Sequence, residues 1–180
     1  MEIRETGIDG LLIISPEVFG DDRGNFCETF NLKEFNKLTG LTPDFVQDNQ
    51  AFSRYGVVRG LHFQRGEHAQ AKLVRVARGR VIDVAVDIRP ESPTFGQHRA
   101  VELSGENFLQ LYIPRGFAHG YAVLSETAVF LYKTDNYYCP ESERGIIWND
   151  PDLAIDWGLP ESDIILSPKD TVWPRLQFTI

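Results

Sequence analysis

The most constraining feature of the sequence is a strand-type alternation between residues 72 and 88. From Val81 onward, bulky apolar side chains occupy nearly every second position as far as Ile88, which is the period of a strand that buries one face. A shorter apolar run at residues 73–76 precedes it, and Gly79 separates the two. The segment therefore predicts a β-hairpin that turns at Gly79.

Short apolar or alternating segments with turn residues between them recur along the chain, as in β-sandwiches and barrels. We expect further strands near residues 11–15, 25–30, 46–52, 57–63, 99–103, 108–113, 117–124 and 128–134. Only residues 32–38 show the apolar spacing of a helix, and the last thirty residues predict an irregular tail with room for a short helix. Because 180 residues suit one domain, we expect a single all-β domain over residues 1–180 with a few short helices.

The chain is acidic overall but basic in one stretch. A formal net charge of -8 argues against a general nucleic-acid or membrane binder. Between residues 51 and 82, however, seven Lys or Arg residues accompany a single acid, Glu67. This local excess predicts an anionic ligand, although solvated strand faces would produce the same pattern.

The cysteines and the hydropathy of the chain bear on its compartment. Cys27 and Cys139 form neither a dense disulfide framework nor a metal-binding spacing, which fits a reducing compartment. The first residues lack the apolar core of a signal peptide, and no apolar run reaches the roughly 18 residues that a membrane helix requires. We expect a soluble, cytoplasmic protein.

Three polar residues in otherwise apolar strand segments could transfer protons next to a carbonyl group. His62 supplies an imidazole, which acts as a general base near neutral pH. The Tyr132 hydroxyl could return a proton, and the Lys72 ammonium could stabilise an enolate oxygen. Single strand residues of these types are more often structural, so the residues alone leave both interpretations open.

A metal site is the alternative for the same region. Residues 114–119 have the Pro-x-Gly-x-x-His form that is similar to the second half of the cupin signature, which ends here at His119. The first half normally supplies a His-x-His pair, but this chain has Gln64 two residues after His62. Two histidines without a further ligand make a poor transition-metal site. We therefore expect no metal.

Several longer motifs carry a resemblance to one family. In chain order they are FGDDRG at 19–24, FVQDN at 45–49, RGLHFQ at 59–64, KLVRV at 72–76, DVAVD at 83–87, PRGFAHG at 114–120, PDL at 151–153 and SPKD at 167–170. With these motifs the chain closely resembles the dTDP-4-dehydrorhamnose 3,5-epimerase family over nearly its whole length. The resemblance implies a cupin-like β-barrel, or jelly roll.

The resemblance also implies a reaction and the residues that carry it. Members epimerise C3 and C5 of dTDP-4-dehydro-6-deoxy-D-glucose to dTDP-4-dehydro-L-rhamnose, without a cofactor, because the C4 ketone acidifies both neighbouring carbons. His62 matches the position of the family's catalytic base. Asp170 matches its orienting partner, and Asp83 is a less favoured candidate for that supporting role. By the same resemblance, Tyr132 matches the position of the catalytic acid, and Lys72 matches the position of the residue that stabilises the enolate. His119 would lie against the sugar.

The family likewise implies substrate-binding positions and a partner. The binding positions match Arg23, Glu28, Gln47, Asn49, Arg59, Lys72, His119, Glu143 and Lys169. Arg23 and Arg59 suit a diphosphate because a guanidinium binds phosphate oxygens through two nitrogens, and Phe26 and Tyr137 would stack on the thymine or close the pocket. Members are homodimers that share strands, so we expect residues 23–28 to reach the site of a partner subunit.

Three other functions use the same residues. One is an epimerase that acts at C3 or C5 alone, or on a related 4-keto sugar, which product stereochemistry would distinguish. The second is a non-catalytic cupin that binds sugar nucleotides, which the presence of both His62 and Tyr132 disfavours. The third is a metal-dependent cupin enzyme, which Gln64 disfavours and a chelator would reveal.

Overall fold

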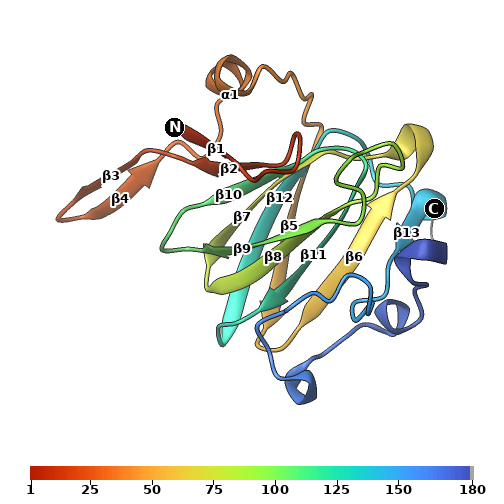
Figure 1. Cartoon of the computed structure of the whole chain (residues 1–180). Helices are drawn as coiled ribbons and strands as arrows, with labels where there is room; N and C mark the ends of the chain where they lie inside the picture. Colours follow the sequence, from red (N-terminus) through yellow and green to blue (C-terminus); the bar gives the residue numbers. More distant parts are fainter. Residues whose placement is uncertain (179–180) are drawn as a thin grey trace.

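Two antiparallel sheets lie face to face in the computed structural model, which describes residues 1–178 (Figure 1). The first sheet has the strand order β1 (Glu2–Glu5), β2 (Leu12–Ser15), β10 (Gln110–Ile113), β7 (Lys72–Arg78), β12 (Thr127–Thr134) and β5 (Gln47–Arg54). The second has the order β13 (Glu143–Gly145), β6 (Val58–Gln64), β11 (Phe117–Val123), β8 (Arg80–Asp87) and β9 (His98–Ser104). The chain has the expected all-β, cupin-like jelly-roll architecture.

The hairpin that we predicted at residues 72–88 is wrong in its pairing. Both strands exist, but β7 pairs with β10 and β12, whereas β8 pairs with β9 and β11 of the other sheet. The chain crosses between the sheets at Gly79, where φ is +81° and a Cβ would lie 2.0 Å from the Thr127 carbonyl oxygen. Alternation identifies a strand and its buried face, but it does not identify the partner, and jelly rolls often place consecutive strands in opposite sheets.

The main apolar core fills the space between the two sheets. Val74 and Phe130 of the first sheet pack there with Ala85, Leu103 and Val123 of the second. These residues alternate along their strands with outward-facing ones, which is why the inner faces exclude water. Tyr121 and Phe130 of this core also line the cavity described below.

The irregular tail covers the outer face of the second sheet. Trp157 and Leu176 of the tail pack against Leu61, Val84 and Ala122 of that sheet. This cover explains why β8 and β11 are buried on both faces. The five short 3-10 helices of residues 1–178, three of them in the tail, are η1 (Gly66–His68), η2 (Pro140–Ser142), η3 (Glu161–Asp163), η4 (Pro168–Thr171) and η5 (Leu176–Phe178).

The single α-helix of residues 1–178, α1 (Leu32–Thr39), confirms the helix predicted at residues 32–38. The Asn31 side chain caps its first turn by accepting a hydrogen bond from the Glu34 amide. Phe35 packs against Leu73 and Tyr112 of the first sheet. No helix of residues 1–178 is both long enough and apolar enough to cross a membrane.

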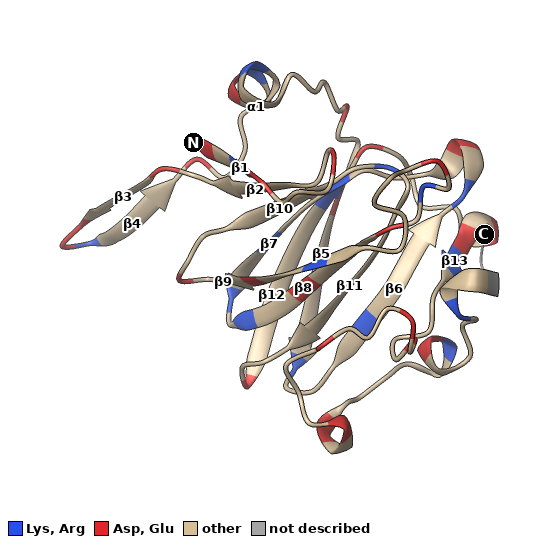
Figure 2. Ribbon diagram, in the orientation of Figure 1, with Lys and Arg blue, Asp and Glu red and all other residues tan. Residues whose placement is uncertain are grey.

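A separate two-stranded ribbon protrudes from the sandwich. It consists of β3 (Val18–Asp21) and β4 (Gly24–Cys27), which pair only with each other within residues 1–178. Figure 1 shows it projecting away from both sheets, and Figure 2 shows acidic and basic residues together at its tip. The sequence prediction placed one strand at residues 25–30 and missed β3.

Candidate active site

A cavity of about 580 Å³ lies between the sheets and receives side chains from both of them and from the tail. Ten of the twelve residues that the sequence proposed for the site line it, namely Gln47, Asn49, Arg59, His62, Lys72, His119, Tyr132, Glu143, Lys169 and Asp170. They come from β5, β6, β7, β11, β12, β13 and the tail helix η4. The fold thus gathers residues that are spread over more than a hundred positions of the chain.

His62 of β6 and Asp170 of η4 form a hydrogen-bonded pair. The His62 Nε2 and the Asp170 Oδ1 are 2.5 Å apart, and the carboxylate is nearly inaccessible to solvent. Ser167 donates to the other carboxylate oxygen at 2.7 Å, and the Trp173 indole donates to Oδ1 at 3.3 Å. Burial raises the pKa of Asp170, but these hydrogen bonds, His62 first, outweigh it and lower the pKa. An ionised Asp170 only accepts hydrogen bonds, so Nε2 of His62 carries the hydrogen and Nδ1 is the basic nitrogen.

A second histidine–carboxylate pair joins the neighbouring strands β11 and β8 of the second sheet. His119 of β11 is the register partner of His62, and its Nε2 is 2.9 Å from the Asp83 Oδ2. Asp83 is fully buried on β8. Burial lowers the pKa of His119 more than Asp83 raises it, so this imidazole is neutral at pH 7. Asp83, which the sequence offered as a less favoured partner for His62, contacts His119 instead.

A β-bulge brings Arg59 and His62 to the same cavity. Residues three apart in a regular strand point to opposite faces. Here Arg59 pairs with Tyr121 and His62 with His119, so β6 has one more residue than β11 over this stretch. The extra residue restores the parity, and both side chains line the cavity.

Glycines make the close approach of β6 and β11 at the bulge possible. A Cβ on Gly60 would lie 2.5 Å from the Gly120 Cα, and a Cβ on Gly120 would lie 2.7 Å from the Arg59 carbonyl oxygen. Any larger residue would force the two strands apart. The positions of Arg59 and His62 therefore depend on these two glycines.

Lys72 and Tyr132 lie on adjacent strands of the first sheet and line the cavity from that side. Burial lowers the pKa of the Lys72 ammonium to about 8, although the carboxylates of Asp83 and Glu143 act in the opposite direction. Burial raises the pKa of Tyr132, and the neighbouring Tyr121 adds to the effect. At pH 7 the cavity therefore holds a cationic amine and a protonated phenol.

Further polar residues line the cavity and form hydrogen bonds with one another. Lys169 forms a 2.7 Å ion pair with Glu143, whose second oxygen accepts a hydrogen bond from the Tyr138 hydroxyl at 3.1 Å. The Gln47 amide donates to the Asn49 side-chain oxygen at 2.9 Å. The Asn49 amide nitrogen is buried and has no partner within residues 1–178. An unpartnered buried donor at a cavity wall suits a polar ligand.

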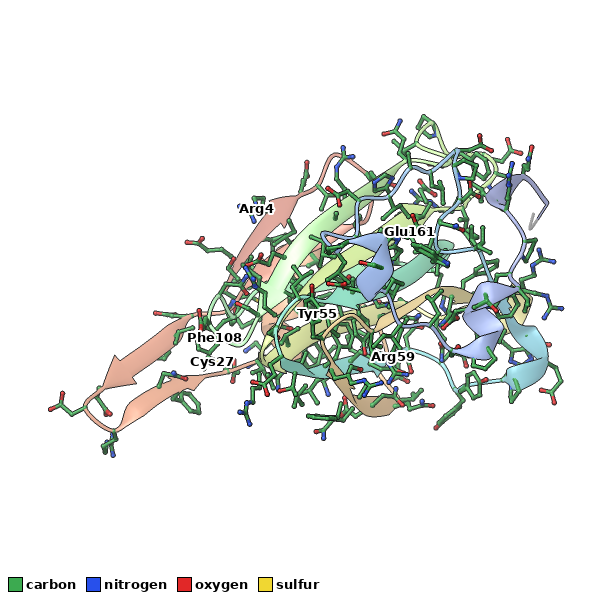
Figure 3. All side chains as sticks on the ribbon, turned by 90° about the horizontal axis from the view of Figure 1, so that it is seen from below. Arg4, Cys27, Tyr55, Arg59, Phe108 and Glu161 are labelled. Carbon is green, nitrogen blue, oxygen red and sulfur yellow. The ribbon has the colours of Figure 1, made fainter. Side chains whose placement is uncertain are left out.

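The other two predicted residues, Arg23 and Glu28, do not line this cavity. Arg23 is exposed at the tip of the β3–β4 ribbon and forms an ion pair with Asp21. Figure 3 shows the labelled Arg59 on the body, away from the ribbon, whose base is marked by Cys27. Within one chain the ribbon and the cavity are therefore separate.

Sequence reasoning missed two tyrosines that line the cavity, Tyr138 and Tyr121, and one serine that lies behind it, Ser53. Tyr138 lines it, whereas Tyr137, proposed for the thymine, is 65% exposed and does not. Two adjacent tyrosines in a loop give no period from which the inward one could be predicted. Tyr121 also lines the cavity, and Ser53 contacts the Arg59 side chain behind it. Tyr121 fell inside the strand predicted at residues 117–124 and Ser53 just beyond the one at 46–52, but the sequence indicated no role for either residue.

Gln64, which stands where a metal ligand would be expected, has structural hydrogen bonds. Its amide nitrogen donates to the carbonyl oxygens of His68 and Tyr137, and its oxygen accepts from the Cys139 amide. No group of three His, Cys, Asp or Glu residues between 1 and 178 is arranged to hold a metal ion. A metal-free site stays a prediction.

The chain is similar in sequence and in fold to proteins of one known family. The model of a family described as dTDP-4-dehydrorhamnose 3,5-epimerase matches residues 5–177. A protein of that name from Escherichia coli K12 is 57% identical over 171 residues, which cover 94% of this chain and 91% of the relative. The crystal structure of a dTDP-6-deoxy-D-glucose-3,5-epimerase from Legionella pneumophila in complex with dTDP-4-keto-L-rhamnose is 54% identical, with a TM-score of 0.95 and coverage of 98% and 93%. A dTDP-4-dehydrorhamnose 3-epimerase from Streptomyces niveus is more distant, at 38% identity over 94% of this chain and 81% of the relative.

Proposed function

The chain belongs to the dTDP-4-dehydrorhamnose 3,5-epimerase family, and from this membership we propose which of its residues carry out the reaction. The enzyme inverts C3 and C5 of dTDP-4-dehydro-6-deoxy-D-glucose and so forms dTDP-4-dehydro-L-rhamnose. Each inversion removes a proton next to the C4 ketone and returns one to the opposite face. The observation that supports our assignment most strongly is the His62–Asp170 pair at the cavity that Tyr132 and Lys72 also line.

His62 is the base. The hydrogen bond to ionised Asp170 fixes the tautomer and leaves Nδ1 free to take a proton. As the imidazole becomes cationic, the buried carboxylate stabilises it. We therefore assign Asp170 an orienting and electrostatic role toward His62.

Lys72 and Tyr132 complete the proton transfer. Removal of the proton places negative charge on the C4 oxygen, and the Lys72 ammonium stabilises that enolate. The Tyr132 phenol, held in its protonated form by burial, donates a proton to the opposite face of the carbon. This division of roles requires no cofactor, because the substrate's own ketone provides the electron sink.

The other lining residues bind the nucleotide. Arg59, with no ion-pair partner among residues 1–178, is available to the diphosphate. Gln47, Asn49, Glu143 and Lys169 offer hydrogen bonds to the sugar and the base, and His119 lies against the sugar. Tyr138 supplies the aromatic surface that we assign to the thymine.

Deuterium incorporation tests this function. The purified protein, treated with a chelator, would be incubated with dTDP-4-dehydro-6-deoxy-D-glucose in deuterium oxide and followed by NMR. We expect deuterium at both C3 and C5. Label at C3 alone would indicate the activity named for the Streptomyces niveus relative, and nucleotide binding without exchange would indicate a binding protein. The variant His62→Ala should lose exchange at both carbons and retain dTDP binding.

We also propose a homodimer in which the β3–β4 ribbon delivers Arg23 and Glu28 to the partner's cavity. Two-stranded ribbons are marginally stable alone, and this one exposes Phe19 (57%) and Phe26 (68%). Exposed aromatic side chains on a protruding element are typical of an interface.

A location in the cytoplasm agrees with the two free cysteines.

Mixing two inactive variants tests the shared site. His62→Ala subunits have an intact ribbon, and Arg23→Ala/Glu28→Ala subunits have an intact cavity. After subunit exchange at equal amounts, half of the dimers are mixed and each mixed dimer regains one complete site. We expect about a quarter of wild-type activity. Activity no higher than the sum of the two separate preparations would contradict the shared site.

A further inference from the structure

The Arg59 side chain is held from behind by a hydroxyl group. Its Nε donates to the Ser53 Oγ at 3.1 Å. Ser53 lies on β5 of the first sheet and is only 4% exposed, whereas Arg59 lies on β6 of the second. The hydrogen bond therefore connects the two sheets next to the cavity.

Tyr121 adds a second hydroxyl to this contact. Its Oη is 3.4 Å from the Ser53 Oγ, and its ring stacks on Phe130 with the centroids 4.1 Å apart and the planes 10° apart. The stack fixes the ring, so the hydroxyl has a defined position beside the Arg59 guanidinium. Burial raises the pKa of Tyr121, and the phenol remains a neutral hydrogen-bonding group at pH 7.

The hydrogen bond to Ser53 occupies one N–H of Arg59, and the guanidinium also interacts with the Tyr121 hydroxyl. A guanidinium carries five N–H donors, and here Nε is the one directed to Ser53. The remaining N–H groups can bind two oxygens of one phosphate group. A long side chain that is already ordered loses less conformational entropy when its ligand binds.

We propose that Ser53 and Tyr121 are positioning residues that orient Arg59 toward the diphosphate of the substrate. The proposal rests on the proposed function, since the anion is the diphosphate of that substrate. Neither residue needs to contact the reacting carbons, and their effect reaches the substrate through Arg59.

Binding of dTDP and of thymidine separates this role from a general structural one. Calorimetry would compare wild type with Ser53→Ala and Tyr121→Phe. We expect the Kd for dTDP to rise about 5- to 10-fold in each variant, the range for one lost hydrogen bond, and the Kd for thymidine to stay unchanged. Tyr112→Phe, at a buried tyrosine in the separate cluster below α1, is the matched control and should leave both Kd values unchanged. Equal weakening of both ligands would overturn the proposal.

A double-mutant cycle gives the second test. In an Arg59→Ala background, Ser53→Ala should have no further effect on dTDP binding, because the group that it positions is gone. A full additive effect would mean that Ser53 acts on the ligand by another route and would overturn the proposal. The deuterium experiment on the wild-type protein is independent of these measurements. Failure of the epimerase assignment would appear there, whereas failure of the positioning role would appear only in the variants.

Discussion

At the scale of single residues, the site is defined by what each ionisable group contacts. His62 and His119 are register partners on neighbouring strands, yet their environments differ. His62 is partly accessible from the cavity and paired with Asp170 of the tail, whereas His119 is buried and paired with Asp83 of the adjacent strand. This difference supports our proposal that His62, the more accessible imidazole, exchanges protons and that His119 lies against the sugar.

Replacing Asp170 with Asn should separate binding from catalysis. The amide keeps the size of the side chain but removes the charge that orients His62 and stabilises its cationic form. We expect kcat to fall about 100-fold or more, with dTDP affinity within about 2-fold of wild type. The measurement is the rate of deuterium exchange at C3 and C5 together with calorimetry. Ser167→Ala, which leaves the Asp170–His62 bond intact, should cost less than about 10-fold, and an equal loss in both variants would contradict the orienting role.

The pKa of Lys72 predicts a decline in activity at alkaline pH. Because burial lowers this pKa to about 8, the ammonium that stabilises the enolate is lost as the pH rises through 8. We expect kcat/KM to fall about 10-fold for each pH unit above that value, since kcat/KM reports the free enzyme. The folded pKa lies below the unfolded one, so the unfolded chain binds more protons between about 8 and 10.5, and this group makes the fold more stable with rising pH. A profile that stays flat to pH 9.5, or that falls together with unfolding, would contradict the assignment.

The sequence predicts site residues that can be recognised from their neighbours in the chain, but it does not predict contacts between residues that are far apart in the chain. The types of His62, Lys72 and Tyr132 and their places on strands were readable locally. The partnership of His62 with Asp170 spans 108 positions, and no local pattern encodes such a contact. It came from the family resemblance, and the same resemblance gave no indication of Ser53.

At the scale of elements, strands were easier to predict than their partners. Most segments with period-two alternation are strands, because that pattern follows from burying one face of a pleated chain. The partners of β7 and β8 depend on where the chain turns after Gly79, which is set by contacts with residues 125–128 far along the sequence. The strands β1 and β3 were missed because their residues are largely exposed, and β13 was missed because its three residues, Glu-Arg-Gly, show no apolar period.

The glycine contact between β6 and β11 gives a prediction at this scale. Gly120→Ala would place a Cβ 2.7 Å from the Arg59 carbonyl oxygen and 3.1 Å from the Gly60 Cα. We expect the free energy of unfolding to fall by about 1–3 kcal/mol and kcat/KM to fall more than about 10-fold, because Arg59 and His62 move with β6. Urea unfolding and exchange kinetics measure the two effects. Gly20→Ala in the ribbon, where the nearest atom is 3.8 Å away, is the control for stability, and a stable, fully active Gly120→Ala would refute the dependence.

At the scale of the whole molecule, the tail both packs against the second sheet and contributes residues to the cavity. Trp157 is 4% exposed, packs on the second sheet and donates a hydrogen bond to the Trp148 carbonyl oxygen at 2.9 Å. The same tail carries Asp170 and Lys169 into the cavity. Folding of the tail and completion of the site are therefore coupled.

Replacing Trp157 with Ala should test this coupling. We expect a loss of about 3–5 kcal/mol in the free energy of unfolding, faster proteolysis after residue 150, and a matching loss of exchange activity at 37 °C. Val172→Ala, at a tail residue that is 76% exposed, should change stability by less than about 0.5 kcal/mol. If proteolysis released the tail while exchange continued at the wild-type rate, the tail would not be needed for the base.

If Arg59 binds the diphosphate and His62 is the base, as we propose, the bulge in β6 bears on which nucleotide sugars fit the site. Arg59, the proposed phosphate anchor, and His62, the proposed base, are separated by two residues of one strand, so the backbone fixes the spacing from which their side chains extend. The linker between nucleoside and sugar must match that fixed spacing. A sugar joined to thymidine through one phosphate would leave either the anchor or the base without its target.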